Sequence, residues 1–261
     1  NESQKKCSRI SVKICKNVKK SNVLCKKKIK KNYFNCLKNI KKRARYLKVR
    51  NKKNWEKELC YLETLLAEAK RELKKSKVSS RAASGKLVAD VIPSKIVVAI
   101  SINENIDRKL FKKSKLSKSK IIKKTMYEIG SKYDFYSRRV SSDGAKGLFQ
   151  QISSSYNVIS KRYPGARLKK NFNKGMRIER NAAKASILHL DNDLEFLLKK
   201  FKKNFSKSDI KIMRRYLVAS YNCGAHRVKN AVLNHGSNWE KHLPLETRIY
   251  LKNFDEIWKV I

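Results

Sequence analysis

The sequence predicts a mostly α-helical protein, in which a basic, Lys-rich segment (residues 1–84) precedes a globular body (residues 85–261). Apolar residues recur at helical spacing in both parts, and no stretch alternates convincingly as a half-buried strand would. All eight glycines and all three prolines lie at Gly85 or later, so the composition changes there. The hydrophobic fraction of 41% is enough to bury a core, which excludes full disorder.

The net charge of the sequence also limits which classes of function are possible. Lys and Arg number 66 against 21 Asp and Glu, a formal charge of +45. Before Lys53 the only acid is Glu2, so the positive charge is densest at the front. Such a charge predicts an anionic partner or surface. The apolar runs are much shorter than the roughly 20 residues of a membrane helix, so no span is expected.

The front segment contains one clear helical pattern. Its apolar residues recur at spacings of three and four, as one helical face requires: Trp55, Leu59, Leu62, Leu65, Leu66, Ala69 and Leu73. Residues 1–54 carry a thinner apolar pattern among lysine runs. That pattern fits either a solvated helical hairpin or a partly disordered segment that orders on contact.

The body shows five helix-length patterns separated by Gly, Pro, Ser and Asn. The first begins near Ser94 and ends at Glu104 and Asn105. The others are expected at residues 121–129, 182–201, 210–219 and 246–260.

No metal or cofactor site is expected from the cysteines and histidines. The six cysteines form no Cys-x-x-Cys pair, and the four histidines lack metal-ligand spacing. Two interpretations stay open for the cysteines, a buried apolar stripe or disulfides in an oxidising compartment. They are Cys7, Cys15, Cys25, Cys36, Cys60 and Cys223.

Three local motifs in the body are candidates for chemistry. The first runs from Ser141 to Gln150 and contains two glycines three residues apart, which permit a tight turn. The second, Ala219 to Gly224, ends an apolar helix in a Tyr-Asn pair and a capping glycine. The third, Pro244 to Tyr250, is a Pro-initiated helix start. Each motif alone is explained equally well by architecture.

The three motifs follow, in this order, an acid that ends an apolar helix. This arrangement resembles that of the lytic transglycosylase family, which includes the soluble lytic transglycosylases and is related to the goose-type lysozymes. The resemblance covers residues 88–258. It implies a lysozyme-like catalytic domain of the α+β lysozyme superfamily. It also implies that the substrate is the glycan strand of peptidoglycan (murein), cut at the β-1,4 bond after N-acetylmuramic acid without a cofactor.

Two residues compete for the catalytic acid. The family's first motif is Pro-x-x-x-Leu-x-Ala-Ile-x-x-x-Glu-Ser, and Pro93, Val97, Ala99, Ile100 and Glu104 fall in step with it. Asn105 stands where the family has Ser, and this alignment needs a basic helical insertion at about 107–136.

Glu128 is the alternative acid, and it needs a much shorter insertion. It would place Lys123 and Lys124 where the family buries apolar residues. Burying an unpaired lysine costs several kcal/mol, whereas a longer surface excursion costs little in loop closure. Packing therefore favours Glu104 over Glu128.

The family reaction needs only one carboxylate. That acid protonates the leaving oxygen, and then helps the sugar's own C6 hydroxyl attack C1 to give a 1,6-anhydro product. By resemblance, Gln150 and the turn with Ser141, Gly144 and Ala145 shape the cleft. Further implied substrate contacts are Tyr221, Asn222 and Tyr250, although the first two could orient the acid and the last could belong to the core.

Several alternatives stay open. A lysozyme-type muramidase would hold a hydrolytic water with a further acid such as Asp134 or Asp143. A non-catalytic murein-binding protein would keep the fold alone. A nucleic-acid-binding protein would explain the charge, but no recognition motif appears. A murein substrate implies the cell envelope, periplasmic or extracellular, where residues 1–84 would contact an anionic wall polymer or membrane surface.

Overall fold

The computed structural model describes residues 55–113, 116–131, 138–201 and 210–261. The chain divides into two compact units, residues 1–52 and residues 53–261. The expectations for residues 1–54, for Asp134 and for the first four cysteines lie outside the described residues. Everything below concerns the second unit.

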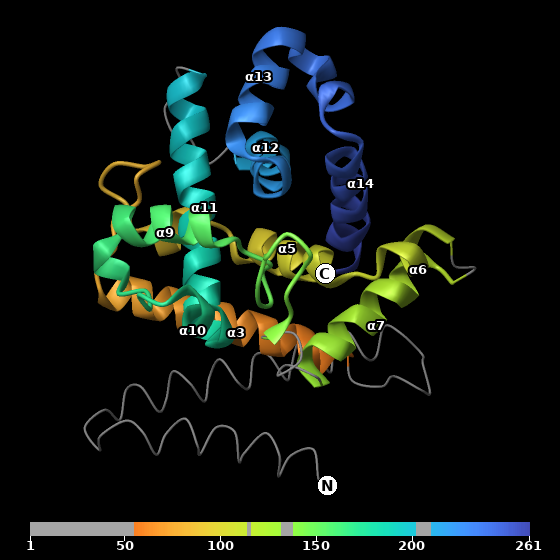
Figure 1. The fold of residues 1–261 in the computed structure, drawn as a ribbon, viewed down its shortest axis with the longest axis horizontal. Coiled ribbons are helices and arrows are strands. Elements are labelled where there is room, and N and C mark those ends of the chain that lie inside the picture. Colours follow the sequence, from red (N-terminus) through yellow and green to blue (C-terminus); the bar gives the residue numbers. More distant parts are fainter. Residues whose placement is uncertain (1–54, 114–115, 132–137, 202–209) are drawn as a thin grey trace, which may run out of the picture. The chain divides into compact units, whose positions relative to one another are not determined.

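The described residues are mostly α-helical, as the sequence predicts (Figure 1). They contain isolated antiparallel bridges, one of them between Val140 and Lys146, but no β-strand. In chain order the helices, including two 3-10 turns (η), are α3 (Trp55–Lys75), α4 (Val88–Val91), α5 (Ser94–Asn105), α6 (Arg108–Lys113), α7 (Lys118–Ser131), α9 (Ser153–Arg162), η1 (Pro164–Ala166), α10 (Phe172–Arg177), α11 (Glu179–Lys200), α12 (Ile210–Cys223), α13 (Ala225–His235), η2 (Gly236–His242) and α14 (Leu245–Val260).

Helix α5 lies in the centre of the unit and carries Glu104 in its last turn. Pro93 is its N-cap in an extended conformation, and Ile106 ends it by returning to an extended conformation. Nine of its twelve residues are buried on all sides, because α3, α7, α11, α12 and α14 all contact it (Figure 1). A helix that is apolar all round is expected only inside a core.

Helix α3 belongs to the same core as the body. Its apolar stripe, from Leu59 to Leu73, is buried against neighbours that include α11 and α7. The compact unit thus begins at Lys53, whereas the change in composition suggested a division at residue 84. The difference has a simple reason, since glycine and proline content marks where turns occur and not which helices share a core.

The region expected as a basic helical excursion, residues 107–136, contains α6 and α7. One face of α7 is buried, with Ile121, Ile122, Met126 and Ile129 in the core. Lys124 lies on the exposed face. The apolar face of α7 is therefore part of the core, whereas its opposite face is exposed.

Over the described ranges, every helix is too short or too polar to span a lipid bilayer.

Candidate active site around Glu104

The carboxyl group of Glu104 is held between the end of α5 and the first turns of α14. The Tyr250 hydroxyl donates a hydrogen bond of 2.7 Å to Oε1 of Glu104. One residue earlier on α5, the Asn103 side-chain amide donates to the Tyr250 carbonyl at 3.0 Å, which fixes the two helices in register. Tyr250 is buried, whereas Glu104 keeps a partly exposed side chain. The acid is thus both anchored and reachable from solvent.

A tight turn at residues 147–150 is attached directly to the end of α5. The Asn105 amide donates to the Leu148 carbonyl at 2.7 Å, and the Tyr221 hydroxyl of α12 donates to the Phe149 carbonyl at 2.7 Å. Asn105 thereby connects the acid-bearing helix to the turn. The structure thus brings Glu104, Tyr221, Tyr250 and this turn together.

The backbone of this turn requires glycine at its start. Gly147 has a φ of +74°, and a Cβ built there would lie 2.8 Å from the Met176 carbonyl oxygen. Gln150 also has a positive φ, +44°, and its amide donates to the Gly147 carbonyl at 2.8 Å. Gln150 thus closes the turn with its own side chain.

The remaining motif residues sit in a second turn just before it. The Ser141 hydroxyl accepts a hydrogen bond from the Ala145 backbone N–H at 3.0 Å, which closes a loop across Gly144. Gly144 has a φ of +76° and open space around it, and Asp143 is exposed at the tip. The Ser141 hydroxyl therefore shapes this second turn.

Asn222 contacts the start of α14. Its side-chain carbonyl accepts a hydrogen bond of 2.7 Å from the Thr247 hydroxyl. The neighbouring residue Tyr221 is partly buried and lies within electrostatic reach of Glu104. Tyr221 and Asn222 therefore link α12 to both the turn and α14.

Burial sets the protonation state of Glu104. Removal of the carboxylate from water raises its pKa from 4.5 to about 7. The Tyr250 hydrogen bond and the charges of Arg108 and Arg139 pull the pKa down, and Glu246 pushes it up, but burial outweighs them. Burial and the nearby Glu104 carboxylate also raise the pKa of Tyr250 and of Tyr221, so both phenols stay protonated. Near neutral pH, Glu104 can therefore hold a proton or release it.

Three charged residues around Glu104 were not predicted from the sequence. Arg139 donates to the Asn105 side chain at 3.1 Å and to the Glu104 carbonyl at 3.3 Å. Arg108 pairs with Glu246 at 2.5 Å on the exposed side of the site. Glu246 belongs to the third motif, but its place beside Glu104 depends on how α14 packs, which no local pattern specifies.

The alternative acid, Glu128, has a different setting. It lies on α7, is partly buried, and its carboxylate is 3.9 Å from the Lys124 ammonium group one turn earlier. Salt bridges at this spacing on a helix surface contribute only about 0.3–0.5 kcal/mol.

The raised pKa of Glu104 predicts a pH-dependent cost to stability. Between pH 4.5 and about 7 the folded state binds more protons than the unfolded state, so the free energy of unfolding falls as pH rises through this window. The charged carboxylate then destabilises the fold by roughly 3 kcal/mol. We expect Glu104→Gln to unfold at a higher temperature than the wild type at pH 8 and at a similar temperature at pH 4. Thermal unfolding at both pH values tests this, and an equal gain at both would contradict it.

The hydrogen bond from Tyr250 favours the ionised form of Glu104, so its removal in Tyr250→Phe is expected to raise the Glu104 pKa further. The pH at which the Glu104 carboxyl titrates, followed by 13C NMR, should therefore move upward from about 7. Tyr216→Phe is a matched control, because Tyr216 packs against Trp239 and is not among the groups that shift the Glu104 pKa. An unchanged Glu104 pKa in Tyr250→Phe would show that the Tyr250 hydrogen bond does not stabilise the ionised Glu104 carboxylate.

The described residues contain no group of three or more His, Cys, Asp or Glu side chains arranged to hold a metal ion. Cys60 lies on α3 and Cys223 ends α12, and both are partly buried. Comparisons of the chain with protein-family models, curated proteins and solved structures gave no match. The interpretation of the Glu104 site therefore depends on the geometry of that site alone.

Proposed function

We propose that this protein is a peptidoglycan lytic transglycosylase with a lysozyme-like fold, and that Glu104 is its catalytic acid and then its base. The observation that carries the proposal is the setting of Glu104. Glu104 lies in the last turn of a buried helix, and its side chain is partly exposed. Its carboxyl has a pKa near 7 and lies beside the turn that begins at Gly147. A carboxyl that is poised near neutral pH is what general acid catalysis requires.

In the proposed reaction, protonated Glu104 gives its proton to the glycosidic oxygen between N-acetylmuramic acid and N-acetylglucosamine as that C–O bond breaks. The carboxylate then accepts the proton of the C6 hydroxyl while O6 forms a bond to C1. Glu104 ends protonated again, so the cycle consumes no water. The Tyr250 hydroxyl stabilises the intermediate carboxylate by its hydrogen bond.

A second candidate, hydrolysis by a muramidase mechanism, is supported by one observation. Glu246 lies within electrostatic reach of Glu104 and is exposed, so it could hold an attacking water. Its ion pair with Arg108 weakens this role, because the guanidinium already occupies a carboxylate oxygen at 2.5 Å. Asp143 lies at an exposed turn tip.

Mass spectrometry of the products from purified murein distinguishes these functions. Transglycosylation gives anhydromuramoyl ends, whereas hydrolysis gives reducing ends that are heavier by one water. We expect anhydro ends from the wild type and from Glu246→Gln. Reducing ends that disappear in Glu246→Gln would establish the muramidase. No product from the wild type would favour a murein-binding role, or nucleic acid as the next ligand to test.

We also propose a cell-envelope setting, periplasmic or extracellular, in which the basic front segment contacts an anionic wall polymer or membrane surface. Because α3 is part of the core, the matching truncation removes residues 1–52 and leaves residues 53–84 intact. We expect this truncation to lose low-salt binding to walls while it retains the 53–261 unit. Wall binding that persists unchanged would reject a tethering role.

A further inference from the structure

A pocket with a volume of about 450 Å³ lies outside the Glu104 site. It is bounded by the segment after α3 and by the junction of α9 with η1, and α11 contributes Glu195. Six of its lining residues can bind a polar ligand: Ser76, Lys77, Ser79, Arg81, Arg162 and Glu195. This volume is within the range of small-molecule sites, and Glu104 is not among the lining residues.

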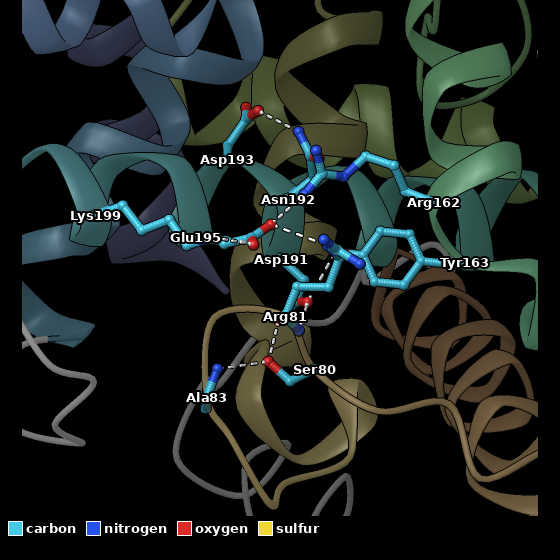
Figure 2. Close-up of polar contacts among 10 residues, drawn as sticks. All are labelled: Ser80, Arg81, Ala83, Arg162, Tyr163, Asp191, Asn192, Asp193, Glu195 and Lys199. Atoms are coloured by element: carbon cyan, nitrogen blue, oxygen red, sulfur yellow. Dashed lines mark hydrogen bonds and ion pairs between the residues drawn. The ribbon is translucent and has the colours of Figure 1, made fainter.

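Glu195 organises the positive charge at this pocket. Figure 2 shows Arg81, Arg162 and Lys199 meeting at its carboxylate. The distances are 3.0 Å from Nε of Arg81, 2.5 Å from a terminal nitrogen of Arg162 and 2.7 Å from Nζ of Lys199. Glu195 is 7% exposed, whereas the two arginine side chains are 41% and 37% exposed. The carboxylate thus lies beneath the guanidinium groups, which keep part of their surface open to solvent.

The charges in the pocket do not cancel. Burial alone would raise the Glu195 pKa, but its bonds to Lys199 and Arg81 and the charge of Arg162 lower the pKa below its ordinary value. Glu195 is therefore ionised and supplies one negative charge. Among the lining residues, all of which the structure describes, Lys77, Arg81 and Arg162 supply three positive charges against that one. The surplus favours an anion of about two charges.

Beneath the pocket, a second carboxylate connects its two walls. Asp191 is fully buried on α11 and accepts hydrogen bonds from the Ser80 hydroxyl at 2.5 Å, from the Arg81 backbone N–H at 2.8 Å and from the Tyr163 hydroxyl at 2.9 Å (Figure 2). Both walls are thereby tied to one carboxylate. Asp191 thus holds the backbone of Arg81, and Glu195 holds the guanidinium groups of both arginines, before any ligand arrives, which lowers the entropic cost of binding.

We propose that this pocket binds the phosphoryl group of a sugar-sized ligand, either a free phosphorylated molecule or one unit of a phosphate-bearing polymer. Guanidinium groups match the oxygens of a phosphoryl group, and Lys77 with the Ser76 and Ser79 hydroxyls adds further donors. The pocket volume leaves room for a polyol or sugar beside the phosphate.

Isothermal titration calorimetry at physiological salt tests the proposal with three probes, which are inorganic phosphate, glycerol 3-phosphate and glycerol. We expect saturable binding of one equivalent of either phosphate and none of glycerol. Tighter binding of glycerol 3-phosphate than of inorganic phosphate would support a sugar-sized phosphorylated ligand, and equal or tighter binding of inorganic phosphate would overturn that ligand class. We expect Arg81→Gln and Lys77→Gln each to weaken binding about tenfold.

The matched control is Lys161→Gln, which removes the same charge from an exposed neighbour on α9 that does not line the pocket. With a net charge of +45, non-specific attraction would weaken equally in all three variants, and that result would overturn the proposal. Lys77 is not one of the three basic residues that pair with Glu195, so Lys77→Gln tests the pocket even if Arg81→Gln unfolds. Glu104→Gln should bind phosphate like the wild type, which separates this site from the proposed reaction.

Discussion

Glu104→Gln is expected to reduce the release of soluble products from murein by about 100- to 10,000-fold, the range that general acid catalysis contributes. The amide can still accept the hydrogen bond from Tyr250, so the geometry of the site should survive while the transferable proton is lost. The variant should also be at least as stable as the wild type above pH 7, because the buried negative charge is gone. An inactive but stable variant would therefore identify a chemical role for Glu104.

The matched variant is Glu128→Gln, which removes the competing acid from α7. We expect it to retain the wild-type rate within about twofold, because an ion pair on a helix surface such as that with Lys124 contributes little to stability. Both rates are measured as soluble anhydro products at pH 6, where most Glu104 is protonated. Loss of activity in Glu128→Gln alone would move the catalytic acid to α7.

Gly147→Ala is expected to cost about 3 kcal/mol of stability and to impair the site as well. The new methyl group would approach the Met176 carbonyl oxygen to 2.8 Å, and the positive φ adds strain of its own. Because Asn105 and Tyr221 both bond to carbonyls of this turn, its displacement should loosen the setting of Glu104.

Gly144→Ala separates these two causes. Gly144 has nearly the same φ, +76° against +74°, but no atom lies within 4 Å of its added Cβ. It should therefore cost only the backbone strain, about 1 kcal/mol. Urea unfolding of both variants gives the difference, and the product assay shows whether only Gly147→Ala loses activity. Equal losses would mean that the contact with Met176 is relieved by small shifts.

Helices with long apolar patterns were predictable from the sequence. The pattern from Ser94 to Asn105 matches α5, and the expected helices at 182–201 and 246–260 correspond to α11 and α14 within a few residues. The short helices α4, α10 and η1 were not identified, because three to six residues are too few to show a helical period. Helix α13 was also missed, although it spans eleven residues.

At the candidate site, the choice between two acids could be argued from packing alone. Lys124 is exposed on α7, whereas Val97 and Ala99 of α5 are fully buried. The charged groups around Glu104 could not be predicted. Arg139 and Glu246 are separated from it by 35 and 142 residues, and only the tertiary fold brings them near.

The hydrogen bond between Tyr250 and Glu104 has a consequence for the order of events during synthesis. Its two partners are 146 residues apart, and ribosomes add roughly 5–20 residues per second, so Glu104 emerges many seconds before Tyr250. Until α14 docks, α5 lacks one of its neighbours and the carboxyl lacks its anchor. A nascent chain would therefore carry an unfinished site until α14 packs against α5 and Tyr250 reaches the acid.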